Sequence, residues 1–91
     1  MALKIERLCE NHSTRVRLSG ELRDAHLVDL RAEIDQFGRP STLDLNEVNV
    51  VDIDGIRFLN QCQTEGIDVV NCSPYIREWM RQEERALRDD E

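Results

Sequence analysis

The chain has 91 residues, which is enough for one domain, because chains below roughly 100 residues seldom hold the apolar surface for two cores. Its 12 Lys and Arg residues against 19 Asp and Glu residues give a formal net charge of −7 at pH 7. This charge repels phosphate backbones and anionic membrane surfaces, so nucleic acid and membranes are excluded as the first partners to consider. We expect a single domain over residues 1–91, with its core at about residues 3–81 and residues 82–91 as a frayed tail or an extension of the last helix.

No run of the sequence approaches the roughly 18 apolar residues of a membrane span, and the first residues alternate charged with apolar side chains, unlike a secretion signal. We therefore expect the protein in the cytoplasm. The three cysteines, Cys9, Cys62 and Cys72, form no Cys-x-x-Cys pair, so the sequence predicts neither a disulfide framework nor a zinc site. Small buried core residues are the simplest role for them.

The first third of the chain predicts a hairpin followed by a helix. Residues 3–6 and 14–18 alternate apolar with charged side chains around a polar turn, which is typical of two half-buried antiparallel strands. Asp24 is the expected N-cap of a helix whose apolar residues then recur at helical spacing. Gly38 is expected to end this helix.

The middle of the chain predicts a strand, a helix and a further strand. Thr42–Leu45 is expected to form a short strand on which Asp44 faces solvent, and residues 46–51 a partly buried connection. A helix is expected to begin close to Gly55, because apolar residues follow it on one helical face. Residues 67–70 predict the last strand.

The last helix has the strongest start signal in the chain, with Ser73 as the cap and Pro74 at the first helical position. The order strand, strand, helix, strand, helix, strand, helix predicts an α/β fold. Its sheet should be mixed but mostly parallel, with about four strands and with the helices on one face. Two aromatic residues of this helix, Tyr75 and Trp79, are expected in the core, with exposure as an anchor for a partner as the alternative.

Four stretches in this order resemble the STAS domain, named for sulphate transporters and anti-sigma factor antagonists. The resemblance covers about residues 3–81 and is most specific at the second strand-to-helix turn, where the family usually reads Asp-Ser-Ser/Ala-Gly-Leu. The stretches are Leu18-Ser19-Gly20-Glu21-Leu22, Leu43-Asp44-Leu45, Val51-Asp52-Ile53-Asp54-Gly55-Ile56 and Asn71-Cys72-Ser73-Pro74.

The resemblance implies a regulatory protein without catalytic activity or cofactor, acting in transcription control in bacteria by partner switching. In such members an anti-sigma factor kinase phosphorylates a serine or threonine directly before the glycine, and this releases the two proteins from each other. Asp54 occupies that position here. An aspartate cannot form the stable phosphoester, so the resemblance transfers the docking surface but not the switch.

Asp54 has two interpretations at a helix N-terminus. It either serves only as the N-cap, since aspartate is among the preferred capping residues, or it permanently imitates the phosphorylated serine. For Asp52 the family implies a residue that shapes the loop, and the simpler interpretation is a turn residue whose side chain accepts hydrogen bonds from local amides.

The expected partner is an anti-sigma factor or a related regulatory complex. A lipid-transport ATPase is the alternative partner, because small single-domain members of the family also dock onto transporters, and a homodimer is a further expectation. The predicted docking segment consists of Val51, Asp52, Ile53, Asp54, Gly55, Ile56, Arg57 and Phe58.

A Mg²⁺-dependent phosphoacceptor is the alternative from another functional class, with Asp52 and Asp54 as carboxylate ligands. Such a site normally needs further acidic ligands and a lysine, and Lys4 is the only lysine. The glycines are scattered and form no phosphate-binding loop.

Overall fold

The computed structural model describes residues 3–89. The predicted order of elements and the α/β class are confirmed. The elements are β1 (Leu3–Glu10), β2 (Ser13–Leu22), α1 (Asp24–Phe37), β3 (Thr42–Val51), α2 (Ile53–Thr64), β4 (Asp68–Val70) and α3 (Pro74–Asp89).

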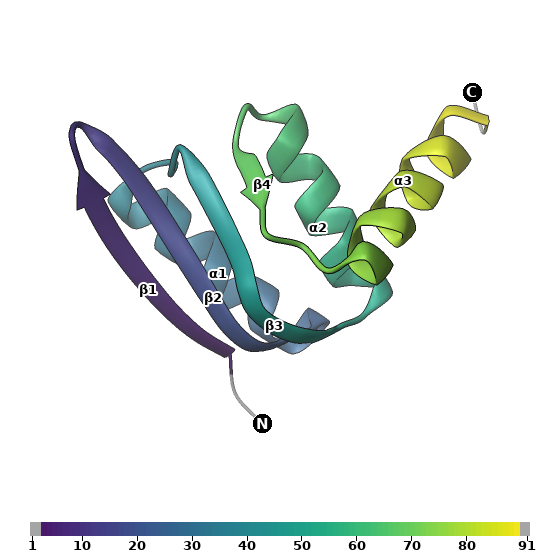
Figure 1. The fold of residues 1–91 in the computed structure, drawn as a ribbon, viewed down its shortest axis with the longest axis horizontal. Helices are drawn as coiled ribbons and strands as arrows, with labels where there is room; N and C mark the ends of the chain where they lie inside the picture. Colours follow the sequence, from purple (N-terminus) through teal and green to yellow (C-terminus); the bar gives the residue numbers. More distant parts are fainter. Residues whose placement is uncertain (1–2, 90–91) are drawn as a thin grey trace.

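The four strands form one sheet in the order β1-β2-β3-β4 (Figure 1). β1 and β2 are antiparallel, as predicted, and the two-residue turn between them places Asn11 and His12 at positive φ of 47° and 70°. Two left-handed residues match the twist of a tight hairpin. β2 pairs with β3, and β3 with β4, in parallel, because α1 and α2 carry the chain back across the sheet.

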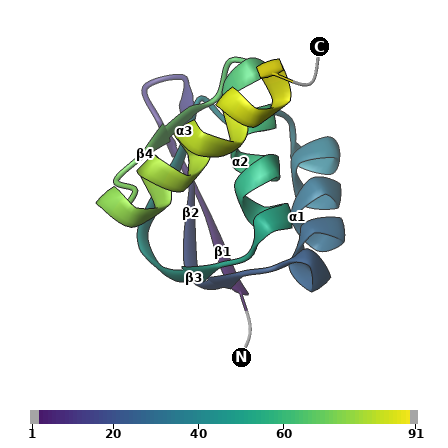
Figure 2. The same ribbon diagram turned by 90° about the vertical axis from the view of Figure 1, so that its right-hand side faces the viewer.

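The core lies between the sheet and the helices. α1 and α2 lie against one face of the sheet, and α3 runs diagonally past the β4 edge and packs on α2 (Figure 2). No helix of the described residues covers the other face of the sheet (Figure 1). The largest fully buried side chains are those of Leu18, Leu22, Leu30, Leu43, Leu45, Ile56, Leu59, Val16, Pro40 and Cys62.

β3 is longer than the sequence predicts, because residues 46–51 continue the strand rather than forming a connection. The buried residues Leu45, Val48 and Val51 recur three positions apart instead of two. The pairing of β2 with β3 shifts twice before it reaches Leu22 opposite Val51, which is the signature of a bulged ladder. The bulges remove the alternation by which a strand is recognised in a sequence.

α3 begins as predicted, with the Ile76 backbone N–H donating to Ser73 Oγ at 3.3 Å. The helix continues to Asp89, so residues 82–89 extend it, and residues 90 and 91 lie outside the described range. No helix among residues 3–89 combines the length and the apolar character needed to cross a membrane.

Candidate functional site

The predicted docking segment lies where two strands end side by side and two helices begin. β2 ends at Leu22 and α1 starts at Asp24, while β3 ends at Val51 and α2 starts at Ile53. The carboxyl ends of parallel strands share one edge of a sheet, so both helix N-termini lie there (Figures 1 and 2). The backbone N–H of Asp52 donates to the carbonyl oxygen of Leu22 at 3.2 Å and ties the two strand ends together.

Asp52 caps both helices at once. Its Oδ1 accepts from the Gly55 backbone N–H, and its Oδ2 accepts from the Asp24 backbone N–H, both at 2.8 Å. The bond to Gly55 confirms the local role predicted for Asp52. The bond to Asp24 joins residues 28 apart in sequence, and no local pattern predicts it.

Two capping predictions are wrong because Asp52 does both tasks. Asp24 is the first helical residue of α1, and Arg23 at the N-cap position makes no side-chain capping bond. Asp54 is likewise inside α2, in its first turn, so it is not the N-cap. One carboxylate accepts one N–H group from the first turn of each helix, at the positive ends of two helix dipoles.

Gly55 allows α2 to approach the sheet closely. A Cβ at this position would lie 2.7 Å from the Leu22 carbonyl oxygen and 2.7 Å from Cγ2 of Val51. Contacts below 3.0 Å essentially do not occur at real Cβ atoms. A glycine is therefore required here by packing, since its φ is not in the left-handed region.

Asp54 is the acid of this site whose side chain is not used by the fold. It is half-buried and, among the described residues, forms no hydrogen bond or ion pair. It is the acidic residue in the first turn of α2, where helix dipoles in general favour negative charge by about 0.3 to 1 kcal/mol. The Asp54 side chain is therefore available to a partner.

The docking segment divides into buried and accessible residues. Asp52, Ile53 and Asp54 are half-buried and Arg57 is exposed, whereas the other four residues are buried. The Arg57 guanidinium donates to Glu83 Oε1 of α3 at 3.1 Å, which fixes its direction. The buried residues, which hold the accessible ones in place, are Val51, Gly55, Ile56 and Phe58.

The arrangement gives little support to the Mg²⁺ alternative. Both oxygens of Asp52 accept backbone amides, so binding a cation would cost capping bonds. Within residues 3–89 no group of three or more His, Cys, Asp and Glu side chains could hold a metal ion. Lys4 lies on the edge strand β1.

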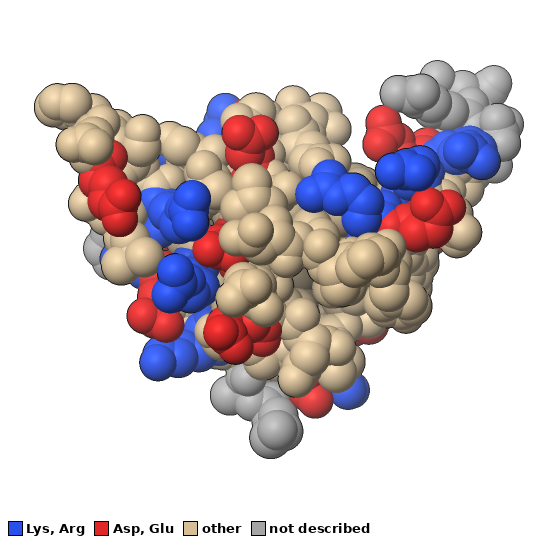
Figure 3. All heavy atoms as spheres, viewed as in Figure 1, with Lys and Arg blue, Asp and Glu red and all other residues tan. Residues whose placement is uncertain are grey.

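The prediction that Asp44 faces solvent is wrong, because the residue is buried, with 2% of its surface exposed. Its Oδ1 accepts from the Asn46 backbone N–H at 3.0 Å and from the Asn71 side-chain amide at 3.1 Å. Its Oδ2 lies 3.3 Å from Arg15 Nη1 and 3.8 Å from Arg17 Nε. Figure 3 shows the mixed charges on this uncovered face of the sheet.

Burial by itself raises the pKa of Asp44, but the hydrogen bonds from Asn46 and Asn71 and the charges of Arg15 and Arg17 outweigh it and hold the pKa below its usual value. The buried carboxylate is therefore charged at neutral pH and binds β2, β3 and the turn after β4 to one another. The sequence signal for a buried Asp44 is the pair Arg15 and Arg17, which lie two positions apart on one face of β2 and whose charges a carboxylate can balance.

The cysteines and aromatic residues divide between core and surface. Cys62 is buried as predicted, which raises the pKa of its thiol to about 11, but Cys9 is exposed.

The prediction of core burial is also wrong for Tyr75, which is 66% exposed. Its ring stacks at a tilt on the half-buried Trp79, with ring centroids 5.7 Å apart. The two rings line a shallow depression of about 410 Å³ together with Glu78 and Gln82.

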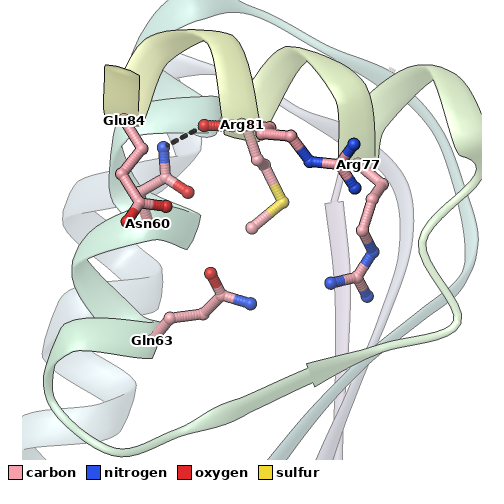
Figure 4. A pocket seen from close by; sticks show the side chains of 6 residues that line it. Asn60, Gln63, Arg77, Arg81 and Glu84 are labelled. Atoms are coloured by element: carbon pink, nitrogen blue, oxygen red, sulfur yellow. Dashed lines mark hydrogen bonds between the residues drawn. The ribbon is translucent and has the colours of Figure 1, made fainter. Parts of the chain in front are cut away.

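A smaller pocket of about 130 Å³ lies between α2 and α3 (Figure 4). The Asn60 side-chain amide donates to the Met80 carbonyl oxygen at 2.8 Å and joins the two helices at its wall. Arg77, which also lines it, donates to the Val69 carbonyl oxygen at 3.1 Å. The Asn60 amide nitrogen and the Arg77 guanidinium thus hold α3 against α2 and β4, so we assign this pocket a structural role. Its lining residues are Asn60, Gln63, Arg77, Met80, Arg81 and Glu84.

A comparison with models of known protein families finds no match, and a search of curated proteins finds no significant similarity. The STAS domain therefore stands as a resemblance, carried by the four sequence stretches and the order of the elements. The α/β fold with a four-stranded mixed sheet is shown by the structure alone.

Proposed function

We propose that the chain is a non-catalytic protein-interaction module, similar to anti-sigma factor antagonists, that binds an anti-sigma factor or a related regulatory complex in the cytoplasm. The binding surface is the start of α2, where Asp52, Ile53, Asp54 and Arg57 are accessible. The remaining residues of the predicted segment support this surface from the core.

The observation that carries the proposal is the contrast between the two acids of the turn. Asp52 is fully used, with one capping bond from each of its carboxylate oxygens. Asp54 lies two residues later in the first turn, is partly accessible, and is not used by any described residue. Because Asp52 already caps α2, the Asp54 side chain is not needed as a helix cap and is available for recognition.

Asp54 supplies a permanent charge where the resembling proteins carry a reversible one. Its carboxylate has about one negative charge, against roughly 1.5 to 2 and three acceptor oxygens for a phosphoserine. We therefore propose a partial mimic of the released state. An anti-sigma factor kinase would meet this charge at the centre of the interface, where an unpaired desolvated carboxylate is unfavourable.

Replacing Asp54 by serine is expected to strengthen binding to an anti-sigma factor kinase of the same cell by about tenfold or more. The reason is that a carboxylate buried in the interface without a partner of opposite charge costs at least about 1.4 kcal/mol. Isothermal titration of wild type and Asp54→Ser against the purified kinase measures this. Phosphorylation of the serine variant by the same kinase is expected to reverse the gain.

Two matched variants separate this effect from a general change of charge. Asp35→Ser removes an exposed acid of α1 and is expected to bind as wild type does. Asp54→Asn removes the charge without supplying a hydroxyl, and it should bind more tightly but resist phosphorylation. Equal affinities of wild type and Asp54→Ser would overturn the mimic.

A further inference from the structure

The outer edge of β1 is the longest unpaired strand edge in the described part of the chain. β1 spans eight residues and pairs with β2 along its whole length without a register shift. No other helix or strand of residues 3–89 lies along its outer side (Figure 1). The opposite edge of the sheet is β4, which has only three residues and lies beside α3. Long regular edges offer a row of free backbone donors and acceptors to another strand.

Two opposite charges stand next to each other on one face of β1, near its start. Lys4 and Glu6 lie on the face without helices, with Nζ and Oε1 3.7 Å apart and with 72% and 41% of their side chains exposed. Ile5 lies between them on the opposite face, half-buried and packed against the core together with Leu3. An antiparallel partner would meet a basic, an apolar and an acidic residue in succession.

We propose that this edge is the interface of a homodimer, in which β1 of two copies pair in antiparallel fashion about a two-fold axis at Ile5. In that register Lys4 of each copy lies opposite Glu6 of the other, which gives two cross-strand ion pairs. The two Ile5 side chains meet on the core side and extend the apolar core across the axis. The two sheets become one sheet of eight strands, twice the four of a single copy.

The charge pattern favours this register over its neighbours. Directly opposite residues in an antiparallel pair share a face, so the two-fold axis must pass between the two copies of one residue. Each choice of that residue gives a different set of cross-strand pairs. An axis at Glu6 opposes that carboxylate to itself, an axis at Arg7 opposes two guanidinium groups, and an axis at Lys4 opposes two ammonium groups. The axis at Ile5 creates no like-charge pair between residues 3 and 7. The proposal depends on the strand edge and is independent of the function proposed for the start of α2.

Sedimentation equilibrium of the full chain tests the proposal. Wild type is expected to dimerise, and Lys4→Glu and Glu6→Lys are each expected to weaken the dimer about tenfold or more, since both cross-strand pairs become repulsive. An equimolar mixture of the two variants is expected to recover the wild-type affinity, because every acid then faces a base. Glu10→Lys makes the same charge change at the end of β1 and should leave the dimer intact.

A covalent readout fixes the register. In a Cys9→Ser background, Ile5→Cys is expected to form a disulfide-linked dimer under mild oxidation, and Leu8→Cys is not. Wild type that stays monomeric up to millimolar concentration would overturn the proposal, as would two charge variants that dimerise as wild type does. A cross-link at residue 8 instead of residue 5 would overturn the register.

Discussion

Gly55→Ala is expected to lower the free energy of unfolding by roughly 2 to 3 kcal/mol, the cost of forcing extra atoms into a packed site. Alanine normally stabilises a helix interior relative to glycine by up to about 1 kcal/mol. At this position the gain is outweighed, because the new Cβ would lie 2.7 Å from both the Leu22 carbonyl oxygen and the Val51 side chain. The Leu22 oxygen belongs to the backbone at the end of β2 and also accepts the Asp52 N–H, so it cannot move freely.

Urea unfolding followed by circular dichroism measures this loss as a lower midpoint with an unchanged slope. Gln63→Ala, on the exposed side of the same helix, is the control and is expected to change stability by no more than about 0.5 kcal/mol. If Gly55→Ala is as stable as wild type, α2 does not lie as close to the sheet as the structure shows.

Asp52→Ala is expected to lower the free energy of unfolding by about 2 kcal/mol, since a lost capping side chain typically costs about 1 kcal/mol and two helices lose theirs. The backbone N–H groups of Asp24 and Gly55, which donate hydrogen bonds to Asp52, would both lose their acceptor. The loss of a negative charge next to two helix N-termini acts in the same direction. Thermal unfolding of the variant against wild type measures the difference.

Asp52→Asn distinguishes the double cap from a single one. Asparagine keeps one acceptor oxygen, so it can cap one helix but not both, and its loss should be about half that of alanine. Asp54→Asn is the matched control, and it should change stability by no more than the dipole contribution of about 0.3 to 1 kcal/mol. If asparagine is as stable as wild type and alanine loses only about 1 kcal/mol, the carboxylate caps one helix and the double cap is contradicted.

The elements that the sequence predicts are those in which local pattern and tertiary packing agree. Residues 14–18 alternate because one face of β2 packs on the helices, and Ser73 and Pro74 start α3 because a cap and a fixed φ act within one turn. The second half of β3 is not predictable in this way, because bulges place its buried residues three apart. A periodicity search assigns such a segment to a loop.

The site residues were predictable only where their partners are near in sequence. The cap from Asp52 to Gly55 spans three residues and follows from the turn, whereas the cap to Asp24 depends on how two strands end together. Alternation with Leu43 and Leu45 predicts the solvent face for Asp44, and the residue does lie on the face without helices. It is buried there because Arg15, Arg17 and Asn71 close over it.

The first turn of α2, with the accessible acid Asp54, is the surface that we propose for partner binding. Nuclear magnetic resonance of the isotope-labelled chain, titrated with its co-purified protein partner, tests this most directly. We expect the largest chemical-shift changes at Asp52, Ile53, Asp54 and Arg57, whether that partner is an anti-sigma factor or a transporter ATPase. Changes confined to the Tyr75 face of α3 or to the outer edge of β1, with the first turn of α2 unaffected, would contradict it.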